Sequence, residues 1–229
     1  MYRDYFFTRK KKNSNNTFLK LIPVILHAVY NIIKNKIWLT MHNHLNTLRN
    51  SIRIVRAKLS VEYKTQAQNK VIRQIQGLKQ WRYAKKIALY HAFQGEIDLS
   101  ELWRTAPLQG KYCAFPVLTE QQSLMFLPAT PASSFSKNRF GIQEPDIPLE
   151  RAIPPEQFDI IFMPLVAFDS ACNRLGMGGG YYDRTFANSR GKYLIGLAYD
   201  FQRVPQLIPR AWDVSLDAII TPSEIFWHK

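Results

Sequence analysis

Hydrophobic residues recur along the chain with two different periods, and the first of these is the period of a helix. Apolar side chains three or four positions apart predict an amphipathic helix over 44–59: Leu45, Leu48, Ile52, Val55 and Leu59. Another face of this helix is expected to carry three arginines: Arg49, Arg53 and Arg56. Ser60 is a suitable N-cap for a second helix over 61–78, which we expect to end at Gly77.

Shorter apolar runs predict strands at 85–93, 111–118, 123–129, 158–168, 192–200 and 216–221. The run over 158–168 is apolar throughout, which is typical of a strand covered on both faces. Between the runs we expect a turn and helix over 94–106, an ordered loop over 141–148 and a helix over 181–189. Strands that alternate with helices indicate a mostly parallel α/β sheet, in a single domain over 41–229 without internal repeats.

The composition is that of a globular protein with free thiols. At 229 residues and 46% apolar side chains, the chain is long enough for one substantial core and too apolar to be disordered. Cys113 and Cys172 form no CxxC pair and no metal-ligand spacing, and the five histidines form no HExxH pattern. We therefore expect no disulfide framework and a reducing compartment, the cytoplasm.

The formal charge of +14 is typical of nucleic-acid-binding proteins, but it is unevenly distributed. Residues 1–40 hold eight Lys and Arg against Asp4 alone, which gives +7 on a short part of the chain. Residues 41–229 hold 23 Lys and Arg against 16 Asp and Glu, again +7. This moderate excess on the body suits an anionic small molecule as well as it suits nucleic acid.

Residues 1–40 are set apart as a basic N-terminal extension. Their apolar segment, Leu21 to Ile33, is shorter than the roughly 20 residues that a membrane span needs, so we expect no stable membrane insertion. No small-residue cleavage site follows it, which argues against a signal peptide. Three interpretations stay open: Met41 is the true start and the extension is not translated, the extension is a disordered membrane-surface or targeting segment, or it belongs to the domain.

Four of the ten glycines lie within residues 176–180, in the stretch "NRLGMGGGYYDR" over 173–184. Such a cluster indicates either a flexible surface loop or a backbone that must approach a ligand closely. It lies between the buried strand and the helix at 181–189, where open α/β sheets bind ligands. Backbone N–H groups and the positive end of the following helix form a nest for anions, so we favour a phosphate-binding loop.

Neither of the familiar nucleotide loops fits this stretch. Gly176 and Gly178 begin a GxGxxG fingerprint, but Tyr181 takes the place of its last glycine. A P-loop requires GxxxxGK[ST], and here neither lysine nor hydroxyl follows. These mismatches count against a nucleotide-binding oxidoreductase, and the position of the charge counts against a nucleic-acid-binding protein.

Five ordered segments carry a resemblance to a known family: "LRNSIRIVRAKLS" at 48–60, "GEIDLSELW" at 95–103, "GIQEP" at 141–145, "DIIFMPLVAFDSACNRLGMGGGYYDR" at 159–184 and "WDVSLDAIITP" at 212–222. Through them, about 46–226 resembles the 5-formyltetrahydrofolate cyclo-ligases, also called methenyltetrahydrofolate synthetases. The resemblance implies a three-layer α/β sandwich with a mostly parallel sheet, of the NagB/RpiA/CoA-transferase type. It also implies conversion of 5-formyltetrahydrofolate to 5,10-methenyltetrahydrofolate with MgATP, through phosphorylation of the formyl oxygen and with release of ADP and phosphate. The alternative is a nucleotide-binding protein of the same fold without cyclo-ligase activity.

The resemblance implies roles for individual residues as well. Nine consecutive residues would wrap the ATP phosphates: Arg174, Leu175, Gly176, Met177, Gly178, Gly179, Gly180, Tyr181 and Tyr182. Arg49 would reach the nucleotide from the opposite side. Asp183 and Asp213 would hold Mg²⁺, which takes one or two carboxylates and keeps several waters. Glu96 would bind the pterin, because a carboxylate accepts from the pterin's ring N–H and amino donors.

Two positions depart from the family's pattern. Gly179 stands where some members have a lysine, so Arg174 or Arg184 is left to supply the catalytic positive charge at the transferring phosphoryl group. Leu45 stands where some members have another lysine, four residues before Arg49. The nucleotide site is therefore expected to be organised differently, although nothing catalytic is deleted.

Several of these residues also have purely structural interpretations. Asp183 would favour the first turn of a helix, and Asp213 would pair with Arg210. Glu96 would cap the helix starting near Leu99, and Arg49 would lie on a solvated helix face. Four aromatic residues are expected either to stack on the pterin or to fill the core: Phe93, Phe168, Tyr181 and Tyr182. The expected partners are ATP and a reduced folate, with or without a polyglutamate tail, and Mg²⁺ is the expected cofactor. We expect a monomer or weak oligomer that binds no nucleic acid.

Overall fold

The computed structural model describes residues 44–229 of the chain. The chain divides into two compact units, Met1–Thr47 and Leu48–Lys229, and the second unit holds the sheet and the residues of interest. The extension predicted over 1–40 lies outside the described residues. Within 44–229, no helix is both long enough and apolar enough to cross a membrane.

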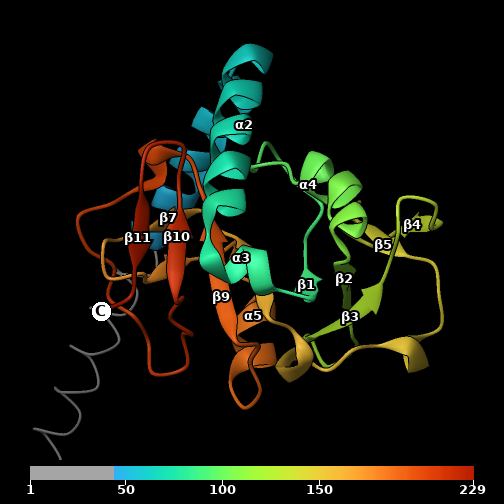
Figure 1. The fold of residues 1–229 in the computed structure, drawn as a ribbon. Coiled ribbons are helices and arrows are strands. Elements are labelled where there is room, and N and C mark those ends of the chain that lie inside the picture. The colour runs from blue at the N-terminus through green and yellow to red at the C-terminus, as the bar shows by residue number, and fades with distance from the viewer. Residues whose placement is uncertain (1–43) are drawn as a thin grey trace, which may run out of the picture. The chain divides into compact units, whose positions relative to one another are not determined.

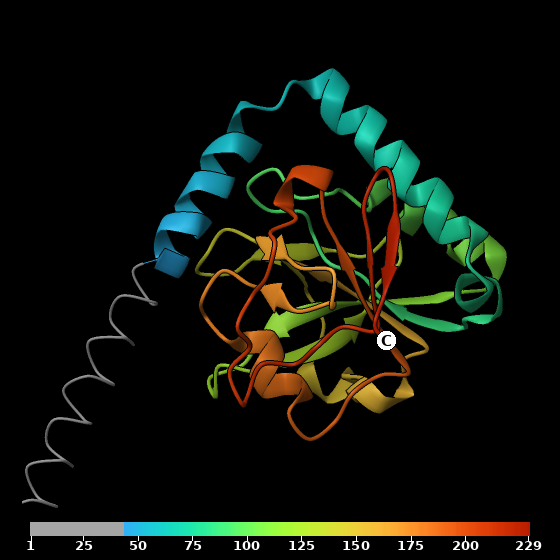
Figure 2. The ribbon, with the colours of Figure 1, turned by 90° about the vertical axis from the view of Figure 1, so that its left-hand side faces the viewer.

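Two long helices come first, as the hydrophobic periodicity predicts. The first covers residues 44–58, and the second, α2, covers Val61–Gly77. Ser60 caps α2, because its Oγ accepts a hydrogen bond of 3.2 Å from the backbone N–H of Tyr63. Figure 2 shows the chain turning between the end of the first helix, in blue, and α2.

The buried face of the first helix differs from the prediction. Val55 is 43% exposed, whereas Arg56 is fully buried next to the buried Ile52. Ile52 and Arg56 are four positions apart, and residues at this spacing lie on the same side of a helix. Placing Arg56 with the exposed Arg53 on a polar face was therefore wrong.

Seven strands form the central sheet in the order β11-β10-β9-β6-β1-β2-β3. Their bounds are Lys86–Ala88 for β1, Tyr112–Leu118 for β2, Leu124–Pro128 for β3, Ile160–Pro164 for β6, Tyr193–Leu197 for β9, Ala218–Ile220 for β10 and Ile225–Trp227 for β11. The four pairings from β10 to β2 are parallel, and only β3 and β11, at the two edges, pair antiparallel. The prediction of a mostly parallel sheet is confirmed.

The remaining elements are short. They are the helices α3 (Lys79–Tyr83), α4 (Ser100–Thr105) and α5 (Tyr181–Phe186), the strands β4 (Phe135–Lys137), β5 (Gln143–Pro145), β7 (Ala167–Phe168) and β8 (Arg174–Leu175), and 3₁₀ turns at Pro107–Gln109, Leu149–Arg151, Pro155–Gln157 and Asp200–Gln202. The expected loop over 141–148 thus contains a strand, β5, which pairs with β4.

The apolar run over 158–168 makes two strands instead of one. β6 ends at Pro164, and β7 then pairs antiparallel with β8 in a separate two-stranded sheet. Proline has no N–H to donate to a neighbouring strand, which suits the end of a ladder. This break places the hairpin β7–β8, and the glycine-rich loop after it, beyond the carboxyl end of β6.

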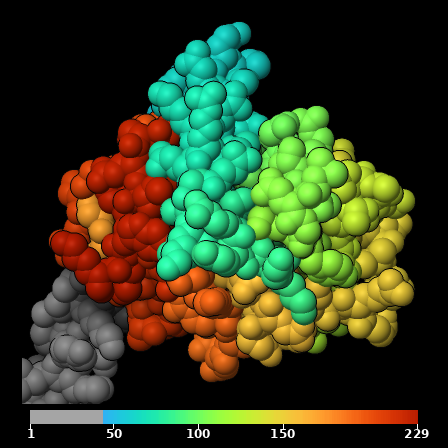
Figure 3. Space-filling view, viewed as in Figure 1, coloured from blue at the N-terminus to red at the C-terminus, as the bar shows by residue number. Residues whose placement is uncertain are grey.

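Helices cover both faces of the sheet. Ile160 and Phe162 of β6 belong to one apolar cluster, with residues of α2, α3 and α4, whereas Ile161 and Met163 belong to a second cluster with Phe186 of α5. This alternation is the period of a strand buried on both faces. Figure 1 shows α2 in front of the strands, and Figure 3 shows it as a ridge between β11 and α4. The expected three-layer α/β sandwich is confirmed.

Candidate active site

The glycine-rich loop, residues 176–180, joins β8 to α5. Gly178 has φ of 101° and Gly180, the N-cap of α5, has φ of 68°. Both values lie in the left-handed region, where residues with a Cβ are strained, so glycine is required at these two positions. Because α5 has only six residues, the backbone of the loop itself, more than a helix dipole, is the feature that suits an anion.

Arg49 lies against this loop, although it comes from the first helix. Its Nε donates a hydrogen bond of 2.9 Å to the carbonyl oxygen of Gly176, and a Cβ on Gly178 would be 3.6 Å from its Cζ. Burial lowers the pKa of Arg49, nearby Arg210 lowers it further, and Asp213 raises it. The fold thus brings Arg49 of the first helix near the segment that holds Arg210 and Asp213, and Arg49 is not on a solvated face.

Arg174 and Asp183 form an ion pair at the two ends of the loop. Arg174 Nη2 is 2.6 Å from Asp183 Oδ1, and the two side chains are only 4% and 19% exposed. The backbone N–H of Val214 also donates to Asp183 Oδ1, at 3.2 Å. Among the described residues, Arg174 Nε is buried without a hydrogen-bond partner. Asp183 therefore does more than favour the first turn of α5: it holds a buried arginine and the segment that follows Asp213.

Asp213 makes a tight turn with Arg210. Its Oδ2 accepts a hydrogen bond of 2.8 Å from the backbone N–H of Arg210, and its own N–H donates to the carbonyl of Arg210 at 3.0 Å. Asp213 thus pairs with Arg210, as the structural interpretation expected, and the contact is with the main chain of Arg210. The hydrogen bond between Val214 and Asp183 links the segment after Asp213 to the second carboxylate.

Two carboxylates from different segments are a donor set that fits Mg²⁺ bridging phosphates. Magnesium is held by one or two carboxylates and completes its shell with phosphate oxygens and water. Residues 44–229 contain no group of three or more His, Cys, Asp or Glu arranged to hold a metal by themselves.

Arg184 lies on the other side of the loop. Its Nε donates to the carbonyl of Gln122 at 2.8 Å, and its Nη2 donates to the carbonyl of Gly179. A Cβ on Gly180 would come within 2.7 Å of its Nη1. These hydrogen bonds hold the loop in shape. Of the two arginines expected near the transferring phosphoryl group, Arg174 and Arg184, Arg174 has the more buried side chain.

Glu96 lies in a second part of the site, after β1. Its Oε2 accepts a hydrogen bond of 3.0 Å from the backbone N–H of Phe93, and its Oε1 is 3.6 Å from Nη1 of the buried Arg56. Burial raises the pKa of Glu96 to about 7, against the opposing effect of Arg56. The alternative role as a helix cap was wrong: Asp98 Oδ1, at 3.0 Å, accepts from the N–H of Ser100 at the start of α4.

Tyr182 of α5 lies beside Arg174. The guanidinium of Arg174 is 5.8 Å from the centre of the Tyr182 ring. Burial raises the pKa of Tyr182, the charge of Glu96 raises it further and that of Arg174 lowers it. The ring thus packs next to the arginine that flanks the glycine-rich loop.

An aromatic cluster that the sequence did not predict lies on the same strand end as Glu96. The His91 ring stacks on Phe115 with centroids 4.4 Å apart, and Trp103 and Phe135 meet it edge-on at 5.9 and 5.0 Å. In the described region, His91 Nε2 and Trp103 Nε1 are buried without hydrogen-bond partners. By contrast, Phe168, expected either at the pterin or in the core, is a core residue that packs on Phe226.

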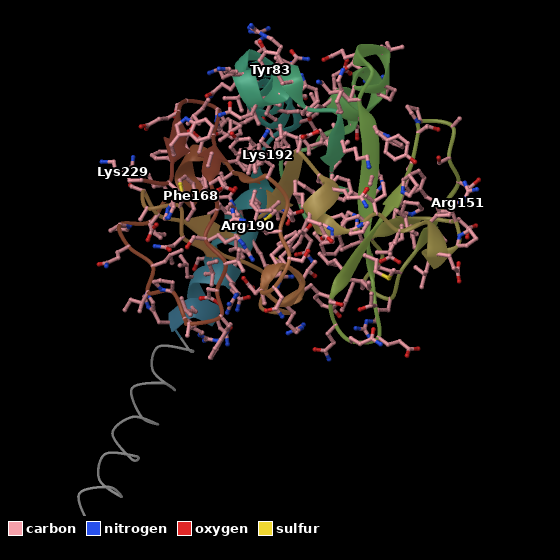
Figure 4. The ribbon with its side chains drawn as sticks, turned by 60° about the horizontal axis from the view of Figure 1, so that its bottom comes forward. Tyr83, Arg151, Phe168, Arg190, Lys192 and Lys229 are labelled. Atoms are coloured by element: carbon pink, nitrogen blue, oxygen red, sulfur yellow. The ribbon has the colours of Figure 1, made fainter. Side chains whose placement is uncertain are left out.

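A separate hollow of about 350 Å³ lies away from all of these residues. It is lined by residues of α3 and its C-cap, by the residue before β6, and by the residue before β9 and the first residue of β9: Lys79, Gln80, Tyr83, Ala84, Asp159, Lys192 and Tyr193. Figure 4 labels two of them, Tyr83 and Lys192. Because Asp159 and Lys192 precede their strands, the hollow is at the amino ends of the parallel strands, whereas ligands of open α/β sheets bind at the carboxyl ends.

Comparisons with known proteins identify the family of this chain. Residues 42–222 match the profile of the 5-formyltetrahydrofolate cyclo-ligase family. The 5-formyltetrahydrofolate cyclo-ligase of Haemophilus influenzae is 42% identical over 177 residues, which are 76% of this chain and 95% of the relative. The Escherichia coli K12 protein of that name is 38% identical over 151 residues, or 62% of this chain and 81% of its own.

A solved structure gives the same result for the fold. The NMR structure of Aquifex aeolicus 5,10-methenyltetrahydrofolate synthetase superposes with a TM-score of 0.72 at 33% identity, covering 81% of this chain and 93% of that one. The structure of a 5,10-methenyltetrahydrofolate synthetase from Mycoplasma pneumoniae superposes with a TM-score of 0.64 at 27% identity. The family resemblance and the fold that it implies are confirmed.

Proposed function

Because the chain belongs to the 5-formyltetrahydrofolate cyclo-ligase family, we propose that it converts 5-formyltetrahydrofolate to 5,10-methenyltetrahydrofolate at the expense of ATP. The products are the methenyl folate, ADP and phosphate. The observation that carries the proposal is the glycine-rich loop, with Arg49 hydrogen-bonded to it and the pair of Arg174 and Asp183 at its two ends. A buried carboxylate, Glu96, follows β1.

The reaction needs no protein nucleophile. The formyl oxygen attacks the γ-phosphorus of ATP while the bond to the bridging oxygen breaks, and ADP leaves. The side-chain amine of the folate then attacks the formyl carbon and loses its proton. The former formyl oxygen departs with the phosphate, which leaves the cyclic methenyl cation. Phosphorylation thereby replaces a hydroxide-like leaving group with phosphate, and positioning supplies most of the catalysis.

The glycine-rich loop binds the phosphates in this proposal. Its backbone, with left-handed glycines at 178 and 180, allows the close approach of an anion. Arg49 and Arg174 add positive charge from two sides, and Arg184 keeps the loop in shape. Mg²⁺ at Asp183 and Asp213 neutralises phosphate charge when it is bound. Arg174 is thus the group we assign to the transferring phosphoryl group in place of the lysine absent at Gly179.

Glu96 orients the folate. Its carboxylate faces the site from the end of β1, and an ionised carboxyl accepts hydrogen bonds from two donors of a pterin edge. We place the pterin near Tyr182, because the charge of Glu96 raises the pKa of this tyrosine and its ring lies beside Arg174. The enzyme acts in the cytoplasm in this proposal, which is supported by the two buried, free cysteines.

The direct test mixes the protein with 5-formyltetrahydrofolate and MgATP and follows the absorbance of the methenyl product. We expect one ATP consumed for each methenyl folate formed. Product without ATP, or ATP hydrolysis without a change in the folate, would show that the proposed reaction is wrong.

A further inference from the structure

A fully buried arginine, Arg56, stands behind Glu96. Its Nη1 is 3.6 Å from Glu96 Oε1 and donates to the carbonyl of Leu165 at 3.3 Å. Its Nε and Nη2 are buried and have no hydrogen-bond partner among the described residues. A buried guanidinium is costly unless it is well paired, and this one uses few of its five donors. Arg56 is therefore poorly explained as a residue kept for stability.

Besides Asp98, two positions along the chain, the titratable groups near Glu96 include three tyrosines from three different elements. They are Tyr90 after β1, Tyr182 of α5 and Tyr199 after β9. Burial raises the pKa of each phenol above its ordinary value, to about 12 for Tyr199. All three are therefore neutral near pH 7. Within residues 44–229, Arg56 is the one cation within 4.0 Å of the Glu96 carboxylate.

We propose that Arg56 is a positioning residue whose buried guanidinium favours the charged form of Glu96 and directs its carboxylate toward the folate ring. The inference rests on the proposed function, since Glu96 is the group that would bind the pterin. The geometry supports it: the main-chain N–H of Phe93 holds one carboxylate oxygen, and Arg56 faces the other. Arg56 itself need not touch either substrate.

Charge on Glu96 matters because of the hydrogen bonds that it must make. An ionised carboxyl accepts from two donors, whereas a protonated one carries an O–H that opposes a ring N–H. Burial alone favours the protonated form, and a nearby cation favours the ionised form. Without Arg56, Glu96 would stay protonated to a higher pH, and folate would bind less tightly near neutrality.

Four variants separate this role from a merely structural one. Arg56→Met and Arg56→Gln remove the charge, Arg56→Lys keeps it, and Arg53→Met removes an exposed arginine of the same helix as a control. The first readout is the titration of the Glu96 side-chain carbon by ¹³C NMR in the free protein, assigned with Glu96→Gln. We expect the midpoint to rise by about one pH unit or more in the two neutral variants. In Arg56→Lys and Arg53→Met it should stay near the wild-type value.

The second readout is equilibrium binding of 5-formyltetrahydrofolate across pH. The neutral variants should bind it about fivefold more weakly at pH 7, because Glu96 is about half ionised there with a pKa of about 7 and only about one-eleventh ionised after a rise of one unit, and they should regain affinity as the pH rises. Binding of ATP should not change. If Arg56→Met does not fold, Arg56→Gln, whose side chain keeps a hydrogen-bond donor, carries both measurements.

The outcomes distinguish this inference from the proposed function. An unchanged Glu96 midpoint in the neutral variants overturns the inference, even if the wild type forms methenyl folate. So does a shifted midpoint with an unchanged folate pH profile. A wild-type protein that binds no reduced folate at any pH overturns the proposed function, and with it the folate part of the inference.

Discussion

Arg174 Nη2 lies 2.6 Å from Asp183 Oδ1, so the arginine assigned to the phosphoryl group and the aspartate assigned to Mg²⁺ are partners. They flank the glycine-rich loop, nine positions apart in the sequence, and both are mostly buried. In the proposed function, a metal-bound phosphate that contacts Asp183 would also contact Arg174. The pair would then couple the shape of the loop to the binding of MgATP.

Asp183→Asn should lower turnover strongly. It removes a charge from the metal clamp and leaves Arg174 without its ion-pair partner, which together cost on the order of several kcal/mol of transition-state stabilisation. Steady-state kinetics at varied Mg²⁺ measure the loss. Asp213→Asn is the matched comparison, and it should lose less because its Oδ2 already accepts from the N–H of Arg210. Wild-type turnover in Asp183→Asn would remove this carboxylate from the mechanism.

Arg49→Met should weaken ATP more than folate. Its Nε holds the carbonyl of Gly176, and charged hydrogen bonds contribute about 1.5–3 kcal/mol, which corresponds to roughly tenfold to a hundredfold in affinity. Titration calorimetry with ATP and with 5-formyltetrahydrofolate gives the two affinities separately. Arg53→Met, which changes an exposed residue of the same helix, should leave both unchanged. Equal losses for the two ligands would mean that Arg49 only supports the fold.

Folate use should rise with pH through about 7. In the free protein Glu96 has its pKa raised to about 7, so it is half protonated there and becomes a full acceptor above that pH. Profiles of kcat/KM for the folate across pH measure this, and Glu96→Gln should flatten them while weakening folate far more than ATP. A wild-type profile that is flat between about pH 6 and about pH 8 would contradict the assignment of Glu96 to the folate.

The carboxyl of Glu96 should affect the stability of the fold in the opposite direction, so that the free energy of unfolding falls over the pH range in which folate use rises. Its pKa is higher in the folded chain than the ordinary value of 4.5, so the folded state binds more protons between those two values. The contribution of Glu96 to the free energy of unfolding therefore falls as pH rises from about 4.5 to about 7. Glu96→Gln should remove that part of the decline, and denaturant unfolding at several pH values shows whether it does.

The sequence was sufficient for the features that follow from local patterns. Helix periodicity located the first two helices, and the density of glycine located the loop at 176–180. It was insufficient for Arg56, because hydrophobic periodicity assigns every arginine to the solvent side, whereas this one is buried with Ile52. Burial of a charge depends on a partner, and here the nearest carboxylate is Glu96, distant in the sequence.

The contacts made by loops could not be predicted from the sequence either. The pair of Arg174 and Asp183 forms because β8 and α5 bring the two ends of the glycine-rich loop together, and no spacing rule predicts that. The aromatic cluster around His91 was missed because the apolar run over 85–93 predicted a strand, while β1 ends at Ala88. His91 lies beyond that end, where its ring stacks on Phe115.

Gly196→Ala should destabilise the fold without altering the chemistry. A Cβ at this position of β9 would lie 2.5 Å from Leu216 Cδ1 and 2.7 Å from Leu165 Cδ2, in a packed core. Overpacking of this kind costs about 1–3 kcal/mol. Urea unfolding measures the loss. Gly77→Ala is the control, because no atom lies within 4 Å of its Cβ position, and it should leave stability unchanged or raise it slightly. An unaltered free energy of unfolding in Gly196→Ala would mean that the core can move aside.

Residues 1–40 should be dispensable for catalysis. Every group assigned to the site lies after them, beginning with Arg49, and the match to the family begins at residue 42. The extension also has a charge of +7 and a composition unlike that of residues 41–229. We therefore expect a chain that begins at Met41 to fold and to match the full chain in kcat and in KM for both substrates. Thermal unfolding and steady-state kinetics on the two chains, side by side, measure this. A large loss of turnover with an unchanged unfolding temperature would show that the extension takes part in the reaction.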